Sequence, residues 1–222
     1  MTEYQKYQNL LGPIPEFLKK YLSLDILLRL KDISLECGMD YASKHAYDIR
    51  FFISRYEHSL SVALITWHLT KDKKATLASL FHDIASPVFS HVIDYMNGDF
   101  INQESTEEKT YEILYNSKEL RELLKIDNID IKDIIDFKKY SIVDLPRPKM
   151  CADRLDNIIA VGMHIVHKID FNDACLIISS LTKVINEDGE EEISFTSEKA
   201  VQKLIESNNA FNQLTHSKKD NY

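Results

Sequence analysis

Four side chains of this 222-residue chain are of the types that bind divalent metals. They are His58 in SRYEHSLSVA, the adjacent pair His82 and Asp83 in LFHDIASPVFSH, and Asp153 in CADRLDN. Two imidazoles and two carboxylates suit a divalent ion such as Mn, Mg, Fe, Ni, Co or Zn, and they leave coordination positions open. Because hydrolysis needs an open position for water or a phosphate oxygen, these residues predict metal-assisted hydrolysis.

The hydrophobic pattern distributes the four ligands over three helical segments. We predict helices at about 13–37, 57–69, 75–84, 103–124, 131–138, 150–168, from 173 onward, and at 197–214. His58 would then lie near the start of the second helix, and Asp153 near the start of the sixth. Successive helical side chains diverge by about 100°, so His82 and Asp83 can straddle one ion at the end of the third helix.

A strand signal follows the helices. The segment TKVINEDGEEEISFT has two alternating arms about Asp188 and Gly189, a pair that tight hairpin turns prefer. The sequence therefore predicts an all-α helical bundle with a small C-terminal β-hairpin. We expect a single domain over residues 1–222, with the motif core at about 50–168, and with the N-terminal helix 14–37 and the C-terminal hairpin and helix 182–214 packed on it.

The composition restricts the functional class. A formal net charge of -8 argues against a general nucleic-acid binder, which would show a basic stripe. The three cysteines, Cys37, Cys151 and Cys175, have no metal-ligand spacing and indicate reduced thiols. We see no signal peptide and no apolar run long enough to span a membrane, so we expect a cytoplasmic protein that does not bind membranes.

These motifs resemble a known group of enzymes. The pattern H…HD…D is typical of the HD-domain metal-dependent phosphohydrolases. The phrases SRYEHSLSVA, HDIASPVFSH and ADRLDN are most similar to the branch of deoxynucleoside triphosphate triphosphohydrolases (dGTPase-like). The resemblance implies an HD-domain fold, a divalent metal and a small phosphorylated substrate such as a nucleotide. Whether the chain forms a homo-oligomer is left open.

The resemblance also implies a role for particular residues. The metal ligands would be His58, His82, Asp83 and Asp153. Arg55 and Arg154 would bind the substrate phosphates, because a guanidinium pairs with two phosphate oxygens at once. The residues around the attacking water would be His91, Asp94 and Glu104, of which the imidazole can act as general acid or base.

Four positions depart from the pattern of this branch. Ser86 and Gln103 stand where the triphosphohydrolases carry histidines, and Asn157 and Val161 stand where they carry a tyrosine and an aspartate that hold the deoxyribose. The metal and phosphate residues are thus kept while the residues that read the sugar are changed. The resemblance supports the reaction type better than it supports a particular substrate.

Other interpretations remain open at this stage. Asp156 could compete with Asp153 as a ligand, or it could support the site from behind or lie on the helix surface. Arg55 and Arg154 could be ordinary salt-bridge partners of Glu57 and Asp156. The chain as a whole could be a catalytically inactive nucleotide-binding sensor, and measuring turnover separates that alternative from an enzyme.

Overall fold

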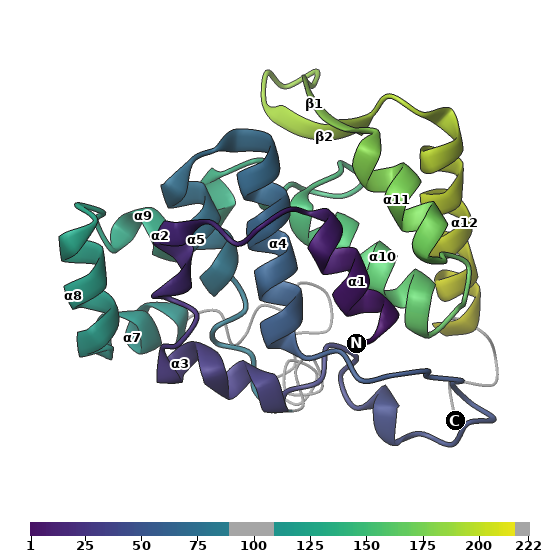
Figure 1. Ribbon diagram of the computed structural model, residues 1–222, viewed down its shortest axis with the longest axis horizontal. Coiled ribbons are helices and arrows are strands. Elements are labelled where there is room, and N and C mark those ends of the chain that lie inside the picture. The colour runs from purple at the N-terminus through teal and green to yellow at the C-terminus, as the bar shows by residue number, and fades with distance from the viewer. Residues whose placement is uncertain (89–108, 216–222) are drawn as a thin grey trace.

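The computed structural model describes residues 1–88 and 109–215, which are mainly helical with one two-stranded sheet (Figure 1). This is consistent with the predicted all-α class. The α-helices are α1 (Glu3–Leu10), α2 (Glu16–Lys19), α3 (Asp25–Leu28), α4 (Arg55–Thr70), α5 (Lys73–Phe81), α7 (Lys109–Asn116), α8 (Lys118–Ile126), α9 (Lys132–Ile135), α10 (Ala152–His164), α11 (Phe171–Ser179) and α12 (Glu198–Thr215). The described residues also form the 3-10 helices η1 (Arg29–Asp32), η2 (Met39–Tyr41) and η3 (Phe137–Lys139).

Helix α4 lies in the middle of the molecule and packs against α5 on one side and α10 on the other (Figure 1). Its apolar side chains enter two buried clusters. Val62 and Ile65 join the cluster made with α1, α10, α11 and α12, whereas Ala63 joins the cluster made with α2, α3, α5 and α8. Because α4 is buried on both sides, its first turn is held between the elements that carry the other predicted ligands.

The N-terminal region differs from the prediction. Instead of one helix over 13–37, the chain forms α2, α3 and η1, because the backbone at Leu24 is extended (φ -67°, ψ 130°) between α2 and α3. Apolar spacing continues through this break, so periodicity did not reveal it. The prediction also missed α1, which Thr2 begins with a capping box that includes Gln5.

The middle of the chain also breaks where one helix was predicted. Within the described part of the 103–124 segment, α7 ends at Asn116, and Ser117 begins α8 by accepting a hydrogen bond from the backbone N–H of Leu120. Serine is a preferred N-cap, because its hydroxyl satisfies a helix N–H that has no partner inside the helix. The 131–138 segment forms α9 followed by η3.

The hairpin prediction is confirmed, with a longer loop. Strands β1 (Leu181–Ile185) and β2 (Glu191–Phe195) pair antiparallel, with Leu181 opposite Phe195 and Ile185 opposite Glu191. The connection therefore covers residues 186–190 and is not a two-residue turn. Gly189 has a positive φ of 82° in this loop, a conformation that glycine adopts without strain.

Helices α10 and α12 approach each other closely at Gly162. A Cβ added at this glycine would lie 2.5 Å from Ser207 Oγ and 2.7 Å from Ile169 Cδ1. The Ser207 hydroxyl also donates a hydrogen bond to the Ile158 carbonyl at 3.1 Å. A side chain at position 162 would force Ser207 or Ile169 to move, so Gly162 allows α10 and α12 to approach this closely.

None of the helices within residues 1–88 and 109–215 is both long and apolar enough to cross a membrane. Cys37, Cys151 and Cys175 are all free thiols, as the sequence predicted.

Candidate metal centre

A capping box positions His58. Ser54 accepts the backbone N–H of Glu57, and the Glu57 carboxylate in turn accepts the Ser54 N–H, so α4 begins at Arg55. His58 consequently lies in the first turn of α4, and 1% of its surface is exposed. The motif therefore fixes the helix start and places the imidazole at the end of α4 that faces the predicted site.

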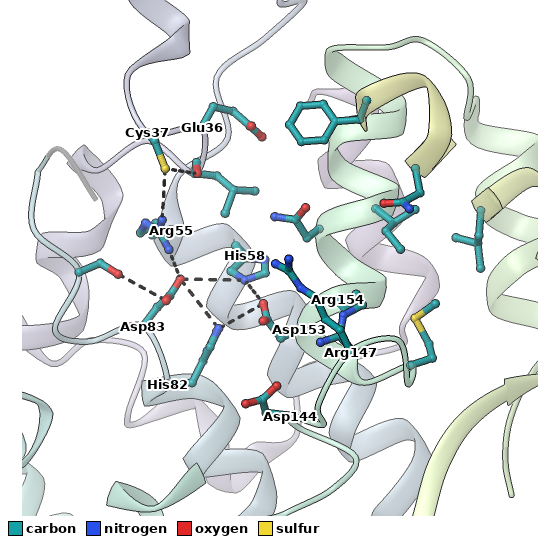
Figure 2. A pocket seen from close by; sticks show the side chains of 18 of the residues that line it. Glu36, Cys37, Arg55, His58, His82, Asp83, Asp144, Arg147, Asp153 and Arg154 are labelled. Carbon is teal, nitrogen blue, oxygen red and sulfur yellow. Dashed lines mark hydrogen bonds and ion pairs between the residues drawn. The ribbon is translucent and has the colours of Figure 1, made fainter. Parts of the chain in front are cut away.

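The end of α5 carries the adjacent pair. The helix ends at Phe81 and not at Ile84 as predicted, with His82 as its C-cap and Asp83 in the turn that follows. The Ser86 N–H donates to the Asp83 carbonyl at 2.9 Å and closes this turn. The two side chains are thus oriented by a turn rather than by helical geometry, and they still face the same region (Figure 2).

Asp153 is the second residue of α10. The preceding residues extend alongside the chain at 142–143, because the Ala152 N–H donates to the Ile142 carbonyl at 2.8 Å. A carboxylate in the first turn of a helix is favoured by the helix dipole. Asp153 reaches the cluster from the side opposite α5, and its side chain is 40% exposed.

The four predicted ligands meet at one place (Figure 2). Ligand atoms of His58, His82 and Asp83 all lie within 4.8 Å of one another. Asp153 Oδ1 is 3.0 Å from His58 Nε2 and 3.6 Å from His82 Nε2. Asp83 Oδ2 is 4.0 Å from His58 Nε2 and 3.8 Å from His82 Nε2. Metal-to-ligand bonds of about 2 Å would fit within these separations.

The tautomers of the two histidines fit a metal. His82 Nδ1 lies 2.7 Å from the Ser79 carbonyl, which can only accept, so Nδ1 carries the proton and Nε2 of the neutral ring has a lone pair. His82 Nε2 is buried and has no hydrogen-bond partner among the described residues. His58 Nδ1 lies 2.7 Å from Asp156 Oδ2, which leaves its Nε2 facing the cluster. The residues therefore fit a divalent ion held through two Nε2 atoms and the carboxylates.

Asp156 supports the site from behind. It is fully buried and accepts hydrogen bonds from the Tyr4 hydroxyl at 2.6 Å and the Tyr7 hydroxyl at 2.9 Å, in addition to His58. Of the roles considered from the sequence, a position behind His58 is the one that this geometry matches. The two tyrosines were missed, and the sequence offers no signal for them beyond the Thr2 and Gln5 capping box that places them on one helix.

The carboxylates of the cluster raise the pKa of both histidines. Burial alone lowers the pKa of His58, but hydrogen bonds to Asp153 and Asp156, together with their charges, outweigh burial and raise that pKa to about 10. Burial raises the pKa of Asp83, yet the charges of Arg55 and the two histidines hold it below its usual range. A site that draws protons onto its imidazoles also attracts cations.

Arg55 contacts the cluster directly. Its guanidinium is buried and its Nη1 lies 2.5 Å from Asp83 Oδ2. The ion pair with Asp83 replaces the pairing with Glu57 that was considered from the sequence, since the Glu57 carboxylate is bound in the capping box at Ser54. Arg55 is therefore placed to orient Asp83, while its role toward phosphate stays a prediction.

Arg154 faces the same cavity but also holds a loop. Its Nη2 donates to the Leu145 carbonyl at 3.0 Å, and its Nη1 donates to the Lys149 carbonyl. These bonds fix the segment that carries Arg147, which lines the cavity as well. A salt bridge to Asp156, considered from the sequence, gives way to these backbone contacts. Phosphate binding by Arg154 remains a prediction.

The cluster opens into a cavity of about 780 Å³. Besides the four predicted ligands, the cavity is lined by the cationic side chains of Arg55, Lys138, Arg147 and Arg154. Figure 2 shows Arg147 and Arg154 beside Asp153. Ser86 and Asn157 also line the cavity, whereas Val161 is buried in the core.

Several predicted residues lie outside the described ranges. These are His91, Asp94 and Glu104, together with the departing position Gln103. The predicted roles of His91, Asp94 and Glu104 around the attacking water therefore stay predictions.

Comparison with known proteins agrees with this geometry. Residues 55–161, which contain all four predicted ligands, match the family model of the HD domain. A 106-residue stretch is 30% identical to the uncharacterized protein YdhJ of Bacillus subtilis, covering 47% of this chain and 32% of that protein. A 134-residue stretch is 27% identical to the metal-dependent phosphohydrolase cns2 of Cordyceps militaris, covering 58% of this chain and 36% of that protein.

These findings support the HD-domain metal-dependent phosphohydrolase superfamily. Members use divalent metals, and the cluster of His58, His82 and Asp83 could hold one. The aligned stretches cover about a third of the length of the two relatives. We refer to residues 55–161 below as the HD segment.

Proposed function

We propose that this chain is a metal-dependent phosphohydrolase that cleaves a phosphate ester or anhydride bond in a nucleotide or a related small phosphorylated molecule. The observation that carries the proposal is the pair of buried Nε2 atoms, each directed into the cavity by a hydrogen bond at Nδ1. A structural histidine does not require the arrangement at His82, whose buried Nε2 lies beside two carboxylates with no hydrogen-bond partner among the described residues. A metal ligand does.

The surrounding residues support phosphate as the reacting group. A bound divalent ion would polarise phosphate oxygens and make an attacking water more acidic. Arg147, Arg154 and Lys138 line the same cavity and carry positive charge that would offset the charge on a phosphate. Arg55 pairs with Asp83 and would keep that carboxylate ionised and oriented.

Within the superfamily, we propose the dGTPase-like branch as the nearest relation, with altered substrate selection. Asn157 lines the cavity where that branch carries a tyrosine, and Val161 is buried where it carries an aspartate. Without hydrogen-bond partners for a deoxyribose, a site loses discrimination more than it loses basal chemistry. We expect weak preference between ribonucleotides and deoxyribonucleotides, or a preferred substrate other than a deoxynucleoside triphosphate.

The test is a turnover screen of the purified chain with Mn²⁺, Mg²⁺, Co²⁺, Ni²⁺ or Zn²⁺. The panel contains nucleoside mono-, di- and triphosphates in ribo and deoxy forms. We expect hydrolysis that depends on the metal and stops with a chelator. Replacing the buried histidine, His58→Gln, should lower turnover by a factor on the order of 10² or more. The matched control His68→Gln, which changes an exposed histidine of the same helix, should retain full turnover.

Two results would count against the proposal. Metal binding without turnover of any panel member would favour an inactive nucleotide-binding sensor. Efficient hydrolysis selective for dGTP, with release of intact triphosphate, would show that the changes at Ser86, Gln103, Asn157 and Val161 are neutral, and it would contradict the altered selection.

A further inference from the structure

Helix α12 turns one face toward the cavity that contains the metal cluster. The lining residues from this helix are Val201, Leu204, Ile205, Asn208, Phe211 and Asn212. Their spacing of three, four and seven residues places them along a single helix face. This helix lies outside the HD segment, so the match to the family assigns nothing to it.

Part of this face is apolar and exposed. Val201 is 36% exposed and Ile205 is 54% exposed, although both are large apolar side chains. Both residues line the same cavity as the metal cluster. Ligand cavities typically combine such apolar walls with a few polar groups, here including the amide of Asn208.

The cavity therefore has two chemically different regions. One contains the four predicted ligands and the nearby guanidinium groups of Arg147 and Arg154 (Figure 2). The other is the wall made by α12, to which Phe195 of β2 and Ile158 of α10 add apolar surface. A phosphate fits the first region, because divalent metals and arginines bind its negatively charged oxygens. A phosphate group gains no binding energy from the apolar wall.

Contacts with α10 and with the core hold the wall in position. Gly162 of α10 allows the close crossing with α12, and the Ser207 hydroxyl bonds to the Ile158 carbonyl at 3.1 Å. Leu204 is buried against the core from the same helix. A preformed wall binds a ligand group without an ordering cost, which increases the affinity that its area provides.

We propose that the α12 wall binds the organic group of the substrate, and that the substrate is an organic phosphate whose apolar or aromatic part lies against Val201 and Ile205, within reach of the Asn208 amide. This inference rests on the proposed function for the position of the phosphate. It goes beyond that function because it names the part of the substrate that contacts α12. It also excludes inorganic phosphate chains as preferred ligands.

The experiment compares two probes that share one phosphonate group and contain no ester bond to hydrolyse. Methylphosphonate carries the anion alone, and 1-naphthylmethylphosphonate adds a flat apolar group. Binding to the full chain is measured by calorimetry, with and without Mn²⁺. Burial of the added aromatic surface should make the naphthyl probe bind about 10-fold more tightly or better.

Two variants test whether the additional affinity of the naphthyl probe comes from the α12 wall. Ile205→Ser removes apolar surface from the wall and should lower affinity for the naphthyl probe by about 5- to 10-fold, with methylphosphonate affinity unchanged. The matched control Ile185→Ser changes a 66% exposed isoleucine of β1 that does not line the cavity. It should leave both affinities unchanged. Retained methylphosphonate binding also shows that each variant is folded.

The outcomes separate this inference from the proposed function. Equal affinity for the two probes, or equal effects of Ile205→Ser and Ile185→Ser, would overturn the role of α12 even if the chain hydrolyses phosphates. A naphthyl preference that depends on Ile205, in a chain that turns over no phosphate, would support the α12 site and reject the hydrolase.

Discussion

His58 and His82 are oriented by different kinds of acceptor. A backbone carbonyl, that of Ser79, holds the Nδ1 proton of His82, whereas the carboxylate of Asp156 holds that of His58. Both arrangements leave Nε2 facing the cavity. Only the second depends on a side chain, so it is the one that a point mutation can change without altering the ligand itself.

Asp156→Asn is expected to weaken binding of a divalent metal by about 10- to 100-fold, because outer partners of metal-binding histidines typically contribute that much. The measurement is competition of Mn²⁺ between the protein and a fluorescent chelator. The matched control Asp133→Asn changes a carboxylate that pairs with Lys74 and Lys139 away from the cavity. Equal affinities of Asp156→Asn and the unaltered chain would show that His58 does not need this partner.

At the scale of elements, α1 and α12 both contribute to a site whose predicted ligands all come from the HD segment. Helix α1 reaches the site through Tyr4 and Tyr7, which bond to Asp156 behind His58. Helix α12 forms a wall of the cavity because Gly162 lets it approach α10. The HD segment therefore supplies the metal residues, and the flanking helices hold and enclose them.

Removal of one hydroxyl tests the contribution of α1. Tyr7→Phe keeps the buried ring and deletes one hydrogen bond to Asp156, which should lower the free energy of unfolding by about 1–2 kcal/mol. Metal affinity should fall as well, by less than in Asp156→Asn, because Tyr4 still holds the carboxylate. Tyr111→Phe, at a tyrosine that is 53% exposed, serves as control. Loss of stability with unchanged metal affinity would limit α1 to a structural role.

At the crossing of α10 and α12, the direction of the change in stability on adding a methyl group tests how closely the two helices pack. In an open helix, Gly→Ala stabilises by up to about 1 kcal/mol. At Gly162 the added methyl group would meet Ser207 and Ile169. We therefore expect Gly162→Ala to destabilise by about 1–3 kcal/mol in denaturant unfolding, because overpacking forces neighbours to move. A stabilised variant would show that the two helices are not in close contact here.

Sequence patterns predicted those elements that have both regular apolar spacing and a polar start or stop. Helix α4 and the hairpin are of this kind, whereas two prolines mark the break before α10. The predicted positions of all three agree with the structure to within a few residues. The breaks at Leu24 and Ser117 were missed because apolar spacing continues through them. The four candidate ligands could be named because each stands in a specific motif. Tyr4 and Tyr7 could not, since their contacts join residues about 150 positions apart.

At the scale of the molecule, the segment between α3 and α4 is tied to the C-terminal end of α10. His164 Nε2 lies 2.7 Å from Glu36 Oε1, with both side chains buried, and His164 Nδ1 lies 3.1 Å from the Phe51 carbonyl. Burial lowers the pKa of His164, but the hydrogen bond and charge of Glu36 outweigh it and raise that pKa above the ordinary value. Protonation of the imidazole therefore forms a buried ion pair with Glu36.

This pair predicts a pH-dependent stability. Because the folded-state pKa of His164 is raised, its contribution is complete below the unfolded pKa of about 6.5 and is lost as the pH rises through the folded value. Glu36→Gln should lower the free energy of unfolding by about 1–3 kcal/mol at pH 6, with a smaller difference at pH 9. A difference between the two proteins that stays constant over this range would contradict the charged pair.

We propose that one divalent ion binds at the junction of α4, α5 and α10. A crystal structure of the full chain grown with Mn²⁺, with anomalous scattering used to locate the ion, tests this proposal most directly. We predict an anomalous peak within about 2.0–2.3 Å of His58 Nε2, His82 Nε2 and an oxygen of Asp83, with Asp153 completing the set. No peak at saturating Mn²⁺, or a peak bound by other residues, would contradict the assignment.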